Sequence, residues 1–584
     1  MDDDLLLQVK RPGRYIGEEW NVSRKDFEKA EVKFALCFPD LYEVGMSNLG
    51  VRIIYGMLNN SAGVVCERFF APDTDMEKIL RTHDLEIFSL ESKRRLCEFD
   101  IAGFSLGHEL GYSNVLNILD LGKIPLAARE RGREYPLVIG GGPCVLNPEP
   151  LHEFFDLFVI GESEEALAEL LETYRSLQHK YKSAAMSKED LLLALARIEG
   201  VYVPSFYEVT YAPSGDIASF TPKLRDVPAR IKKRFVKDFE NSFFPEAWLV
   251  PNVQVVHDRI TLEVMRGCPN TCSFCQARQQ YFPYRVRQPQ RILQLAAQAY
   301  RLSGYEELSL GGLSVSDYPH LAAVLTCLIG LFKDRGVSTS LPSIKPKAQL
   351  GELSSLIATI KKTGHTFAPE AASERLRTML HKNFDERDFF DTLAQAYKSG
   401  YQHIKLYFMI GLPSETEADL DAIIEFAQRA SELRRGKGLG PAQVNISITT
   451  LIPKPHTPLQ WLKMEGLQEM QRKQECLKKK AARHKRLRLH FHNPYMSFLE
   501  GIFSRGDRRL SRVLLTAFEQ GARFDAWDDY FVFERWEKAF AACAITPEFY
   551  LREKPREEVL PWDVIDVGIH RETLKDEFEK IVDM

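Results

Sequence analysis

The chain has 584 residues, of which 45% are hydrophobic and 27% charged, as is typical of soluble globular proteins. At roughly 150 residues per domain it has room for about four domains, which argues against a short peptide-like module, a fibrous repeat or global disorder. The formal net charge of −4 excludes binding of nucleic acid through overall charge, so any charge-driven partner must be recognised locally.

The first residues, MDDDLLLQVK, lack the basic segment and apolar stretch of a secretory signal. The longest apolar stretch, residues 321–332, is about a dozen residues long, and roughly 20 are needed to cross a bilayer. The ten cysteines are mostly scattered, which argues against a disulfide framework. We therefore expect a cytoplasmic protein with no membrane association.

After an N-terminal extension at residues 1–31, residues 32–177 alternate short apolar runs with helix-length segments. The runs are KFALCF, DIAGFSL, YPLVIGGG and DLFVIGE. This alternation is typical of βαβ units and predicts a Rossmann-like domain with a parallel, doubly wound sheet. Because ligands bind beyond the carboxyl ends of such strands, the turns that follow these runs are expected to share one rim.

The rest of the chain is predicted to contain a connector, a barrel and a helical region. Residues 178–255 are irregular and interrupted by proline. Residues 256–462 contain six apolar runs with helical patterns between most of them, which predicts a partial (β/α)6 barrel with its chemistry in the loops after the strands. Residues 463–584 are predicted to be mostly helical and basic. The overall fold class is therefore α/β.

Three cysteines, Cys268, Cys272 and Cys275, lie within eight residues directly after the strand-like run ITLEVM. Three thiolates can wrap one face of a metal centre, and their softness selects zinc, copper(I) or an iron–sulfur cluster. A closed zinc site normally has four protein ligands, and no nearby Cys or His at finger-like spacing completes one. A [4Fe-4S] cluster on three cysteines would leave one iron free to bind a substrate or cofactor.

With Phe274 before the third cysteine, the segment reads Cys-x3-Cys-x-aromatic-Cys at the start of a β/α barrel. It resembles the signature of the radical S-adenosylmethionine (SAM) superfamily. The resemblance implies that the open iron chelates the amino and carboxylate groups of SAM. It also implies that one electron from the reduced cluster, delivered by a reductant such as flavodoxin or ferredoxin, cleaves SAM to methionine and a 5'-deoxyadenosyl radical.

The same resemblance assigns SAM contacts to residues at the ends of the other barrel strands. The glycines of SLGGLS would let the backbone approach the methionyl amino group, and the glycine of FMIGLPSE would lie against adenine. Residues that end the third and fourth strands are candidates for the ribose and carboxylate. Together with Phe274, the expected SAM residues are Gly311, Gly312, Ser343, Glu370, Arg375 and Gly411. After the last barrel strand, Lys454 and His456 are expected to contact substrate.

The first turn of the Rossmann-like domain has the spacing of the Asp-x-His-x-x-Gly motif of cobalamin-binding domains. Asp40 and Gly45 match it, but Tyr42 occupies the position of the histidine that ligates cobalt, and a neutral phenol is a poor cobalt ligand. Ser105, Gly141 and Gly142 stand where that fold meets the nucleotide tail and the corrin side chains. The domain thus resembles a cobalamin-binding domain without its axial histidine.

This domain order resembles an uncharacterised subgroup of radical SAM proteins with a B12 (cobalamin)-binding-like N-terminal domain. Stretches that carry the resemblance include FPDLYEVGMSNLG, VIGGGPCVLNPEP and IPKPHTPLQW. Two interpretations of the N-terminal domain follow. It binds cobalamin base-off, with Tyr42 beneath the cobalt, in a methyltransferase, or its pocket is vestigial and serves in docking or substrate selection.

Nine Lys or Arg residues fall between positions 472 and 488, a density that could neutralise several phosphates. RNA is therefore a possible substrate or partner, and a solvated helix face is the alternative. The leading hypothesis is an enzyme that uses a [4Fe-4S] cluster and SAM to modify RNA or a metabolite, with cobalamin if it methylates. The alternatives are a non-catalytic iron–sulfur protein that binds RNA or assists assembly, and a zinc-thiolate module.

Overall fold

The N-terminal domain is built on a six-stranded sheet in the order β2-β1-β3-β4-β5-β6. The structure is a computed structural model that describes residues 3–340, 365–398, 400–435 and 440–583. All neighbouring strands of this sheet are parallel except β5 and β6. The strands are β1 (Val32–Phe38), β2 (Val64–Phe70), β3 (Ile101–Ser105), β4 (Leu137–Gly141), β5 (Leu157–Val159) and β6 (Val201–Tyr202).

Helices follow the parallel strands, as the alternating apolar runs predict. Asn48 caps α3, since its side chain accepts a hydrogen bond from the Val51 amide. The helices are α3 (Leu49–Asn60), α4 (Thr74–Thr82), α5 (Tyr112–Leu121), α6 (Ser163–Lys182) and α7 (Lys188–Leu195). The domain boundary expected at residue 177 falls inside α6. The domain continues through α7 and the antiparallel strand β6, which completes the sheet.

The expected connector contains a hairpin of β7 (Tyr207–Tyr211) and β8 (Ile217–Pro222). Its next strand, β9 (Ile231–Lys232), pairs with β19 (Ile565–Asp566) near the other end of the chain. This pairing explains why the segment looks irregular in sequence, since the partner of β9 lies more than 300 residues away.

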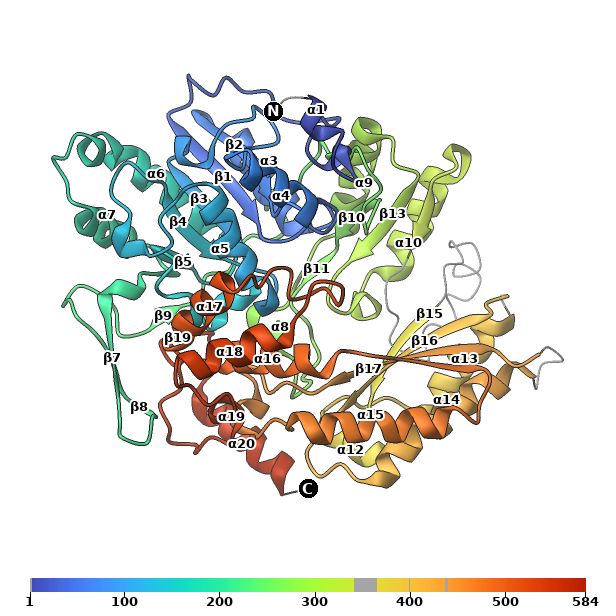
Figure 1. The fold of residues 1–584 in the computed structure, drawn as a ribbon. Helices are drawn as coiled ribbons and strands as arrows, with labels where there is room; N and C mark the ends of the chain where they lie inside the picture. Colours follow the sequence, from blue (N-terminus) through green and yellow to red (C-terminus); the bar gives the residue numbers. More distant parts are fainter. Residues whose placement is uncertain (1–2, 341–364, 399, 436–439, 584) are drawn as a thin grey trace.

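The barrel strands lie in two parallel sheets. One holds β10 (Ile260–Glu263), β13 (Glu307–Gly311) and β14 (Ser338–Ser340), and the other begins with β15 (His365–Glu370), β16 (His403–Ile410) and β17 (Gln443–Thr450). Their helices lie on the outside of the strands in Figure 1. These helices are α9 (Pro289–Ser303), α10 (Leu321–Phe332), α13 (Glu386–Lys398) and α14 (Glu417–Arg435).

The C-terminal region is mostly helical but contributes one strand to the barrel. β18 (Leu487–Phe491) pairs parallel with β17, so the sheet extends beyond the boundary expected at residue 462. It lies at the edge of the sheet, and its alternating buried and exposed residues indicate that one face is covered and the other solvated. The helices are α15 (Leu467–Ala481), α16 (Pro494–Arg505), α17 (Leu510–Glu519), α18 (Phe533–Ala542), α19 (Glu548–Leu551) and α20 (Arg571–Val582).

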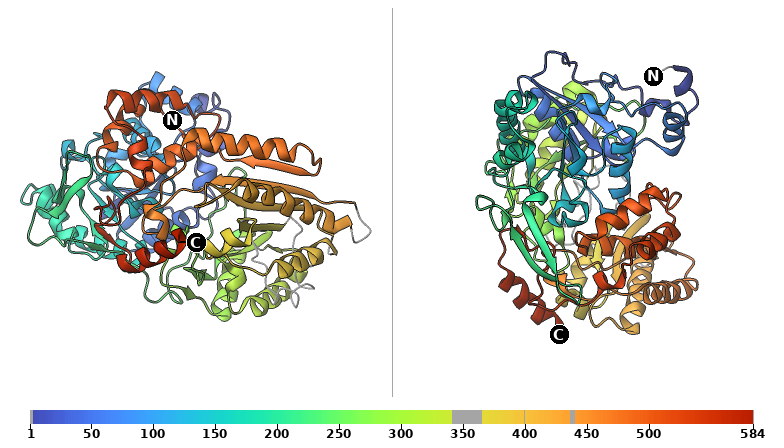
Figure 2. Two further views of the ribbon diagram at one scale, coloured as in Figure 1. Left: turned by 90° about the horizontal axis from the view of Figure 1, so that it is seen from below. Right: turned by 60° about the vertical axis from the view of Figure 1, so that its left-hand side comes forward.

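The C-terminal helices pack against the N-terminal domain. Both views in Figure 2 show the red C-terminal helices beside the N-terminal domain, and one apolar core contains residues of both. Polar contacts join them too. The Ser113 hydroxyl donates to Asp525 at 2.6 Å, and the Trp527 indole donates to Asp40 at 3.0 Å. The N-terminal domain and the C-terminal region therefore share one core.

The predicted fold class is confirmed. The chain is α/β, with a Rossmann-like N-terminal domain, six barrel strands from β10 to β17 and a mostly helical C-terminal region. Among the residues that the structure describes, no helix is both long enough and apolar enough to span a bilayer.

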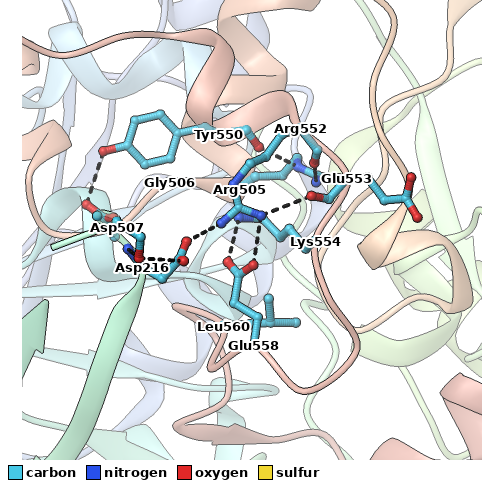
Figure 3. Close-up of polar contacts among 12 residues, drawn as sticks. Asp216, Arg505, Gly506, Asp507, Tyr550, Arg552, Glu553, Lys554, Glu558 and Leu560 are labelled. Atoms are coloured by element: carbon cyan, nitrogen blue, oxygen red, sulfur yellow. Dashed lines mark hydrogen bonds and ion pairs between the residues drawn. The ribbon is translucent and has the colours of Figure 1, made fainter. Parts of the chain in front are cut away.

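Arg505 holds the C-terminal region together through backbone carbonyls. Its guanidinium, fully buried, donates to the carbonyls of Tyr550, Leu462 and Arg552, each at 2.9 Å. Figure 3 shows it among the side chains of Tyr550, Arg552 and Glu558. Burial lowers the pKa of Arg505 to about 9. The carbonyls thus compensate a buried cation and tie the end of α16 to the loop after α19.

A buried ion-pair network joins the N-terminal domain to the barrel. Glu162, which follows β5, accepts hydrogen bonds from Arg266 at 3.0 Å and Arg285 at 2.9 Å. Arg266 also pairs with Glu263 at the end of β10 and with Glu164 at the start of α6. Burial opposes ionisation of Glu162, but the two arginines lower its pKa below the ordinary value. The network therefore fixes the end of β5 against the end of β10.

We expect Glu162→Ala to lower the free energy of unfolding by about 3–5 kcal/mol, because it leaves two buried arginines partly uncompensated. Chemical denaturation and limited proteolysis measure this loss. Glu475→Ala is the matched control, because the Glu475–Lys478 pair is exposed and its removal should not change stability measurably. Equal stability of the two variants would contradict the role of the network.

Two neutral histidines lie where other parts of the chain pack against the N-terminal domain. His456, after β17, contacts the Leu146 carbonyl through Nε2 at 3.1 Å, and His152 contacts the Ser511 hydroxyl at 2.9 Å. Burial lowers the pKa of His456 to about 4 and that of His152 to about 3. His456, expected from the sequence to contact substrate, is thus buried in the packing between the barrel and the N-terminal domain.

Because the unfolded chain protonates His456 near pH 6.5 and the folded chain only near pH 4, stability should fall as the pH drops through this interval. The contribution of His456 alone is about 3 kcal/mol. In His456→Gln the amide can still donate to Leu146 without titrating, so the thermal midpoint should depend less on pH between 6.5 and 4. The exposed control His179→Gln should keep the wild-type profile, and identical profiles for all three proteins would refute this assignment.

Candidate functional site

The three cysteines lie on a tight loop at the entrance to the barrel, residues 267–275, here called the cysteine loop. It follows β11 (Met265–Arg266), which pairs antiparallel with β12 (Arg285–Val286). Gly267 has a φ of +81°, and a Cβ there would lie 2.7 Å from the Tyr281 carbonyl oxygen. Glycine is therefore required for the turn that brings Cys268 to the end of the strand.

All three thiols are partly exposed, so a ligand can reach them. Cys275 precedes α8 (Gln276–Gln280). Burial raises the pKa of Cys275, while backbone N–H groups of Ala277 and Arg278, together with Lys382, favour its thiolate. The Asn270 amide lies 3.4 Å from the Cys268 sulfur. Three thiols on one loop, with donors aimed at two of them, suit a soft metal centre.

The cysteine loop is anchored to the segment after β15. The Ser273 amide donates to the Leu380 carbonyl at 3.0 Å, and Ser273 is fully buried. Phe274, expected to contact SAM, packs against an apolar cluster that includes Leu376, Leu412 and Trp461. The loop is thus held in place by packing from several barrel elements.

The other expected SAM residues lie at the carboxyl ends of barrel strands. Gly311 ends β13, Glu370 ends β15 and Gly411 follows β16. Gly411 has a φ of +80°, and its N–H donates to Glu415 at 3.0 Å. Ser343 lies outside the described residues. The structure therefore brings Gly311, Glu370 and Gly411 to the side of the barrel that carries the cysteine loop.

Glu370 and Arg375 already have protein partners. Burial raises the pKa of the Glu370 carboxyl, which lies 3.5 Å from the Lys382 ammonium. Arg375 pairs with Asp419 at 2.6 Å and donates to the Ser414 hydroxyl at 3.0 Å. Arg375 is thus held against α14, and a role for it at SAM would require it to leave Asp419.

A cavity of about 530 Å³ lies between the N-terminal domain and the barrel. Ser105, Gly141 and Gly142 line it from the rim of the N-terminal sheet, and Gly311 and Gly312 line it from β13. The cavity is therefore lined both by residues expected to contact cobalamin and by residues expected to contact SAM. Its volume lies within the range of small-molecule sites.

The cavity has open space beside Gly141, because glycine has no side chain to fill it. A Cβ on Gly141 would have the Val159 carbonyl oxygen as its nearest neighbour, 3.8 Å away. Gly142 differs, since its φ is +110° and a Cβ would lie 2.7 Å from the Leu106 carbonyl oxygen. Gly141 thus leaves room for a ligand, whereas Gly142 permits the turn.

The near-motif residues Asp40, Tyr42 and Gly45 do not line the cavity. Tyr42 is 2% exposed and donates from its hydroxyl to Glu19 at 2.9 Å. A Cβ on Gly45 would lie 2.2 Å from the Phe70 ring. The expectation that Tyr42 lies beneath a bound cobalt does not fit this arrangement, because the N-terminal extension covers the tyrosine and engages its hydroxyl.

A second polar cluster at the rim was not identified as a unit from the sequence. His108 and Glu109 follow β3, and Glu500 belongs to α16. The Lys454 ammonium lies between Glu109, at 2.7 Å, and Glu500, at 2.8 Å, and the His108 ring lies 3.3 Å from Glu500. Burial opposes the charged forms, but these contacts raise the pKa of Lys454 and lower that of Glu500.

This cluster joins three parts of the chain. His108, Glu109 and Glu500 are close enough to bind a cation, and the Lys454 ammonium occupies the position between the two carboxylates. Only the turn at residues 105–109 and the position of Lys454 after the last barrel strand gave a signal in the sequence. Their partner Glu500 lies in a helix with no motif.

The basic segment folds as α15 and the edge strand β18. Part of its charge is engaged by acidic side chains. Arg472 pairs with Glu417, Lys473 with Glu415, Lys478 with Glu475 and Lys480 with Asp421. The density of positive charge in the sequence thus overstates the charge that this surface can offer to a polyanion.

Two family models match this chain. The model described as "Radical SAM proteins, N-terminal" matches residues 50–204, and the model described as "Radical SAM superfamily" matches residues 262–427. Together the two matches span more than half of the 584 residues. The second match contains the cysteine loop and the ends of β10 to β16.

Two curated proteins are similar in sequence. "Uncharacterized protein MJ0966" of Methanocaldococcus jannaschii is 27% identical over 486 residues, which cover 82% of this chain and 90% of that protein. "Uncharacterized methyltransferase PH0819" of Pyrococcus horikoshii is 25% identical over 216 residues, which cover 35% of this chain and 45% of that protein.

Among solved structures, the chain shares its fold with the radical SAM methyltransferase TsrM from Kitasatospora setae, whose structure contains cobalamin and a [4Fe-4S] cluster. The TM-score is 0.53 at 14% identity, and the match covers 87% of this chain and 99% of TsrM. The two matched family models, together with the cysteine loop, show that the chain is a radical SAM enzyme.

Proposed function

We propose that this protein is a cobalamin-dependent radical SAM methyltransferase. The observation that carries the proposal is the cavity, because it is lined both by the rim of a B12-binding-like domain and by Gly311 and Gly312, near the cysteine loop. A corrinoid at this position would lie between the domain that binds it and the barrel that binds SAM. The similarity to an uncharacterised methyltransferase supports the reaction class.

Cys268, Cys272 and Cys275 would hold the [4Fe-4S] cluster. The fit rests on the donor set, three thiols on a loop whose geometry is fixed by Gly267 and by the buried Ser273. Gly311, Gly312 and Gly411 would allow SAM to approach the backbone closely. When bound, the reduced cluster supplies one electron to SAM, and a one-electron reductant such as flavodoxin or ferredoxin would restore it.

Ser105, Gly141 and Gly142 would hold cobalamin at the rim of the N-terminal sheet. The fit rests on the space beside Gly141, which no side chain fills. Tyr42 lies outside this cavity and donates to Glu19, so it would not contact a cofactor bound there. When bound, cobalamin supplies a carrier for the methyl group.

The chain's own residues would exclude water and keep the two halves of the site together. The Glu162–Arg266–Arg285 network closes the cavity on the side where β5 meets the barrel. The Lys454–Glu109–Glu500 cluster joins the rim to the C-terminal region. A radical reaction requires such closure, because water and other small molecules would otherwise quench the reactive species.

The substrate is a metabolite or an RNA. The engaged charges on α15 give RNA little support, so we favour a metabolite. The competing function is a non-catalytic iron–sulfur protein that keeps SAM as a structural ligand. Comparing the metabolites and modified nucleosides of deletion and wild-type cells by mass spectrometry would identify the substrate, and a product with one methyl group fewer in the deletion would support methyl transfer.

We expect anaerobically purified protein to contain iron and sulfide and to release 5'-deoxyadenosine when incubated with SAM and dithionite. Cys272→Ala should lose most of the iron and all of this release, because two thiolates do not hold the cluster. Elemental analysis and chromatography of the nucleoside products measure the two effects. Cys327→Ala is the matched control, since this thiol is exposed on α10 outside the cysteine loop.

Zinc in place of iron would favour the zinc-thiolate alternative. Iron and sulfide without release of 5'-deoxyadenosine would favour the non-catalytic alternative. Either outcome would overturn the proposed enzyme, and both can be read before the substrate is known.

We expect protein incubated with hydroxocobalamin to retain a visible corrin band after desalting. Gly141→Val should abolish this band, because its side chain would occupy the open part of the cavity while its Cβ meets no atom closer than 3.8 Å. Iron content and thermal midpoint should stay unchanged, which separates loss of the cofactor from loss of the fold.

Gly330→Val is the control for the substitution itself. A Cβ on Gly330 meets no atom within 4 Å, and this residue lies on the exposed side of α10. It should retain the corrin band at the wild-type level. Wild-type protein without a retained band would instead support a vestigial pocket that serves in docking or substrate selection.

A further inference from the structure

We infer that the inner end of the cavity selects the lower base of the corrinoid and accepts an apolar base, such as dimethylbenzimidazole, in preference to adenine. The inference rests on the proposed function, because it concerns the nucleotide tail of the same cofactor.

Strand register places the polar and apolar linings of the cavity at different depths. Ser105 pairs with Gly141 at the carboxyl ends of β3 and β4. Two residues earlier, Gly103 pairs with Ile139 and also with Leu36 of β1. Because side chains two residues apart in a strand share a face, all five residues lie on the cavity side of the sheet. The cavity thus passes from a polar rim at Ser105 to an apolar floor at Leu36 and Ile139.

The helices that cover this face repeat the gradient. α3 contributes Asn48 at its N-cap and then Ile53 and Ile54 further along. α6 contributes Ser163 and Glu164 in its first turn and then Leu167 one turn later. The polar residues of both helices therefore stand at the rim, and their aliphatic residues stand over the floor.

The floor also presents an aromatic ring. A Cβ on Gly103 would lie 2.4 Å from Cζ of Phe34, so the ring lies directly over the backbone of β3. Among the described residues that line this inner end, no side chain carries a polar atom. The lining of the inner end consists of Phe34, Leu36, Ile53, Ile54, Gly103, Ile139, Val159 and Leu167.

An apolar lining of this kind favours aromatic bases that carry few polar groups. Adenine carries an exocyclic amino group and several ring nitrogens, and the burial of each of these groups without a hydrogen-bond partner is unfavourable. Dimethylbenzimidazole replaces the amino edge with two methyl groups, whose burial is favourable. The backbone groups of the sheet floor are paired between strands and are not free to satisfy a purine.

The test compares three corrinoids on the full-length protein. These are cobalamin, the cobamide with adenine as lower base, and cobinamide, which lacks the nucleotide tail. Binding is titrated by the change in visible absorbance, and retention is checked after desalting. We expect cobalamin to bind at least tenfold more tightly than the adenine cobamide, which corresponds to about 1.4 kcal/mol, and cobinamide to bind most weakly.

The outcomes separate this inference from the proposed function. Equal or tighter binding of the adenine cobamide overturns the selection, while binding of any corrinoid leaves the cobalamin proposal standing. Equal binding of cobinamide and cobalamin also overturns it, because the tail would then contribute nothing. If none of the three corrinoids binds, the cobalamin proposal itself fails.

A substitution in the wall provides a second test. Leu167→Asn places an amide over the floor and should reduce the preference for cobalamin over the adenine cobamide at least threefold. Leu177→Asn, further along α6 and away from the cavity, should leave the preference unchanged. Because the preference is a ratio measured within one variant, partial loss of folded protein does not alter it. An unchanged ratio in Leu167→Asn would contradict the assigned wall.

Discussion

The ion pairs of Glu162 with Arg266 and Arg285 set the relative position of the two halves of the site. Glu162 follows a strand of the N-terminal sheet, and both arginines flank the cysteine loop in the chain. The carboxylate therefore relates the rim of the N-terminal sheet to the loop that carries the three thiols. Buried charges of this kind are costly unless fully paired, so the junction has few alternative arrangements.

The N-terminal domain and the barrel were predictable because their signals are local. Apolar runs at the spacing of βαβ units predict parallel sheets, and three cysteines within eight residues after a strand predict a soft metal centre. The common rim on which Ser105 and Gly141 lie was predicted in the same way, since the carboxyl ends of parallel strands meet at one edge. Each of these inferences needs only residues that are close together in the sequence.

The contacts that the sequence did not reveal join residues far apart in the chain. β9 pairs with β19, β18 extends the barrel sheet, and Lys454 lies between Glu109 and Glu500. Tyr42 gives the same lesson, because its place in a motif suggested a cofactor contact while the N-terminal extension engages it through Glu19. A near-motif reports spacing, whereas burial depends on segments that pack from elsewhere.

The apolar core shared by the N-terminal sheet and helices α16 to α18 has a consequence for biosynthesis. Side chains such as Phe503, Leu514 and Trp536 complete the packing around strands that the ribosome makes several hundred residues earlier. The N-terminal domain cannot bury its full core until helices α16 to α18 have emerged. The final packing of the N-terminal core is thus tied to the synthesis of helices made long after its own strands.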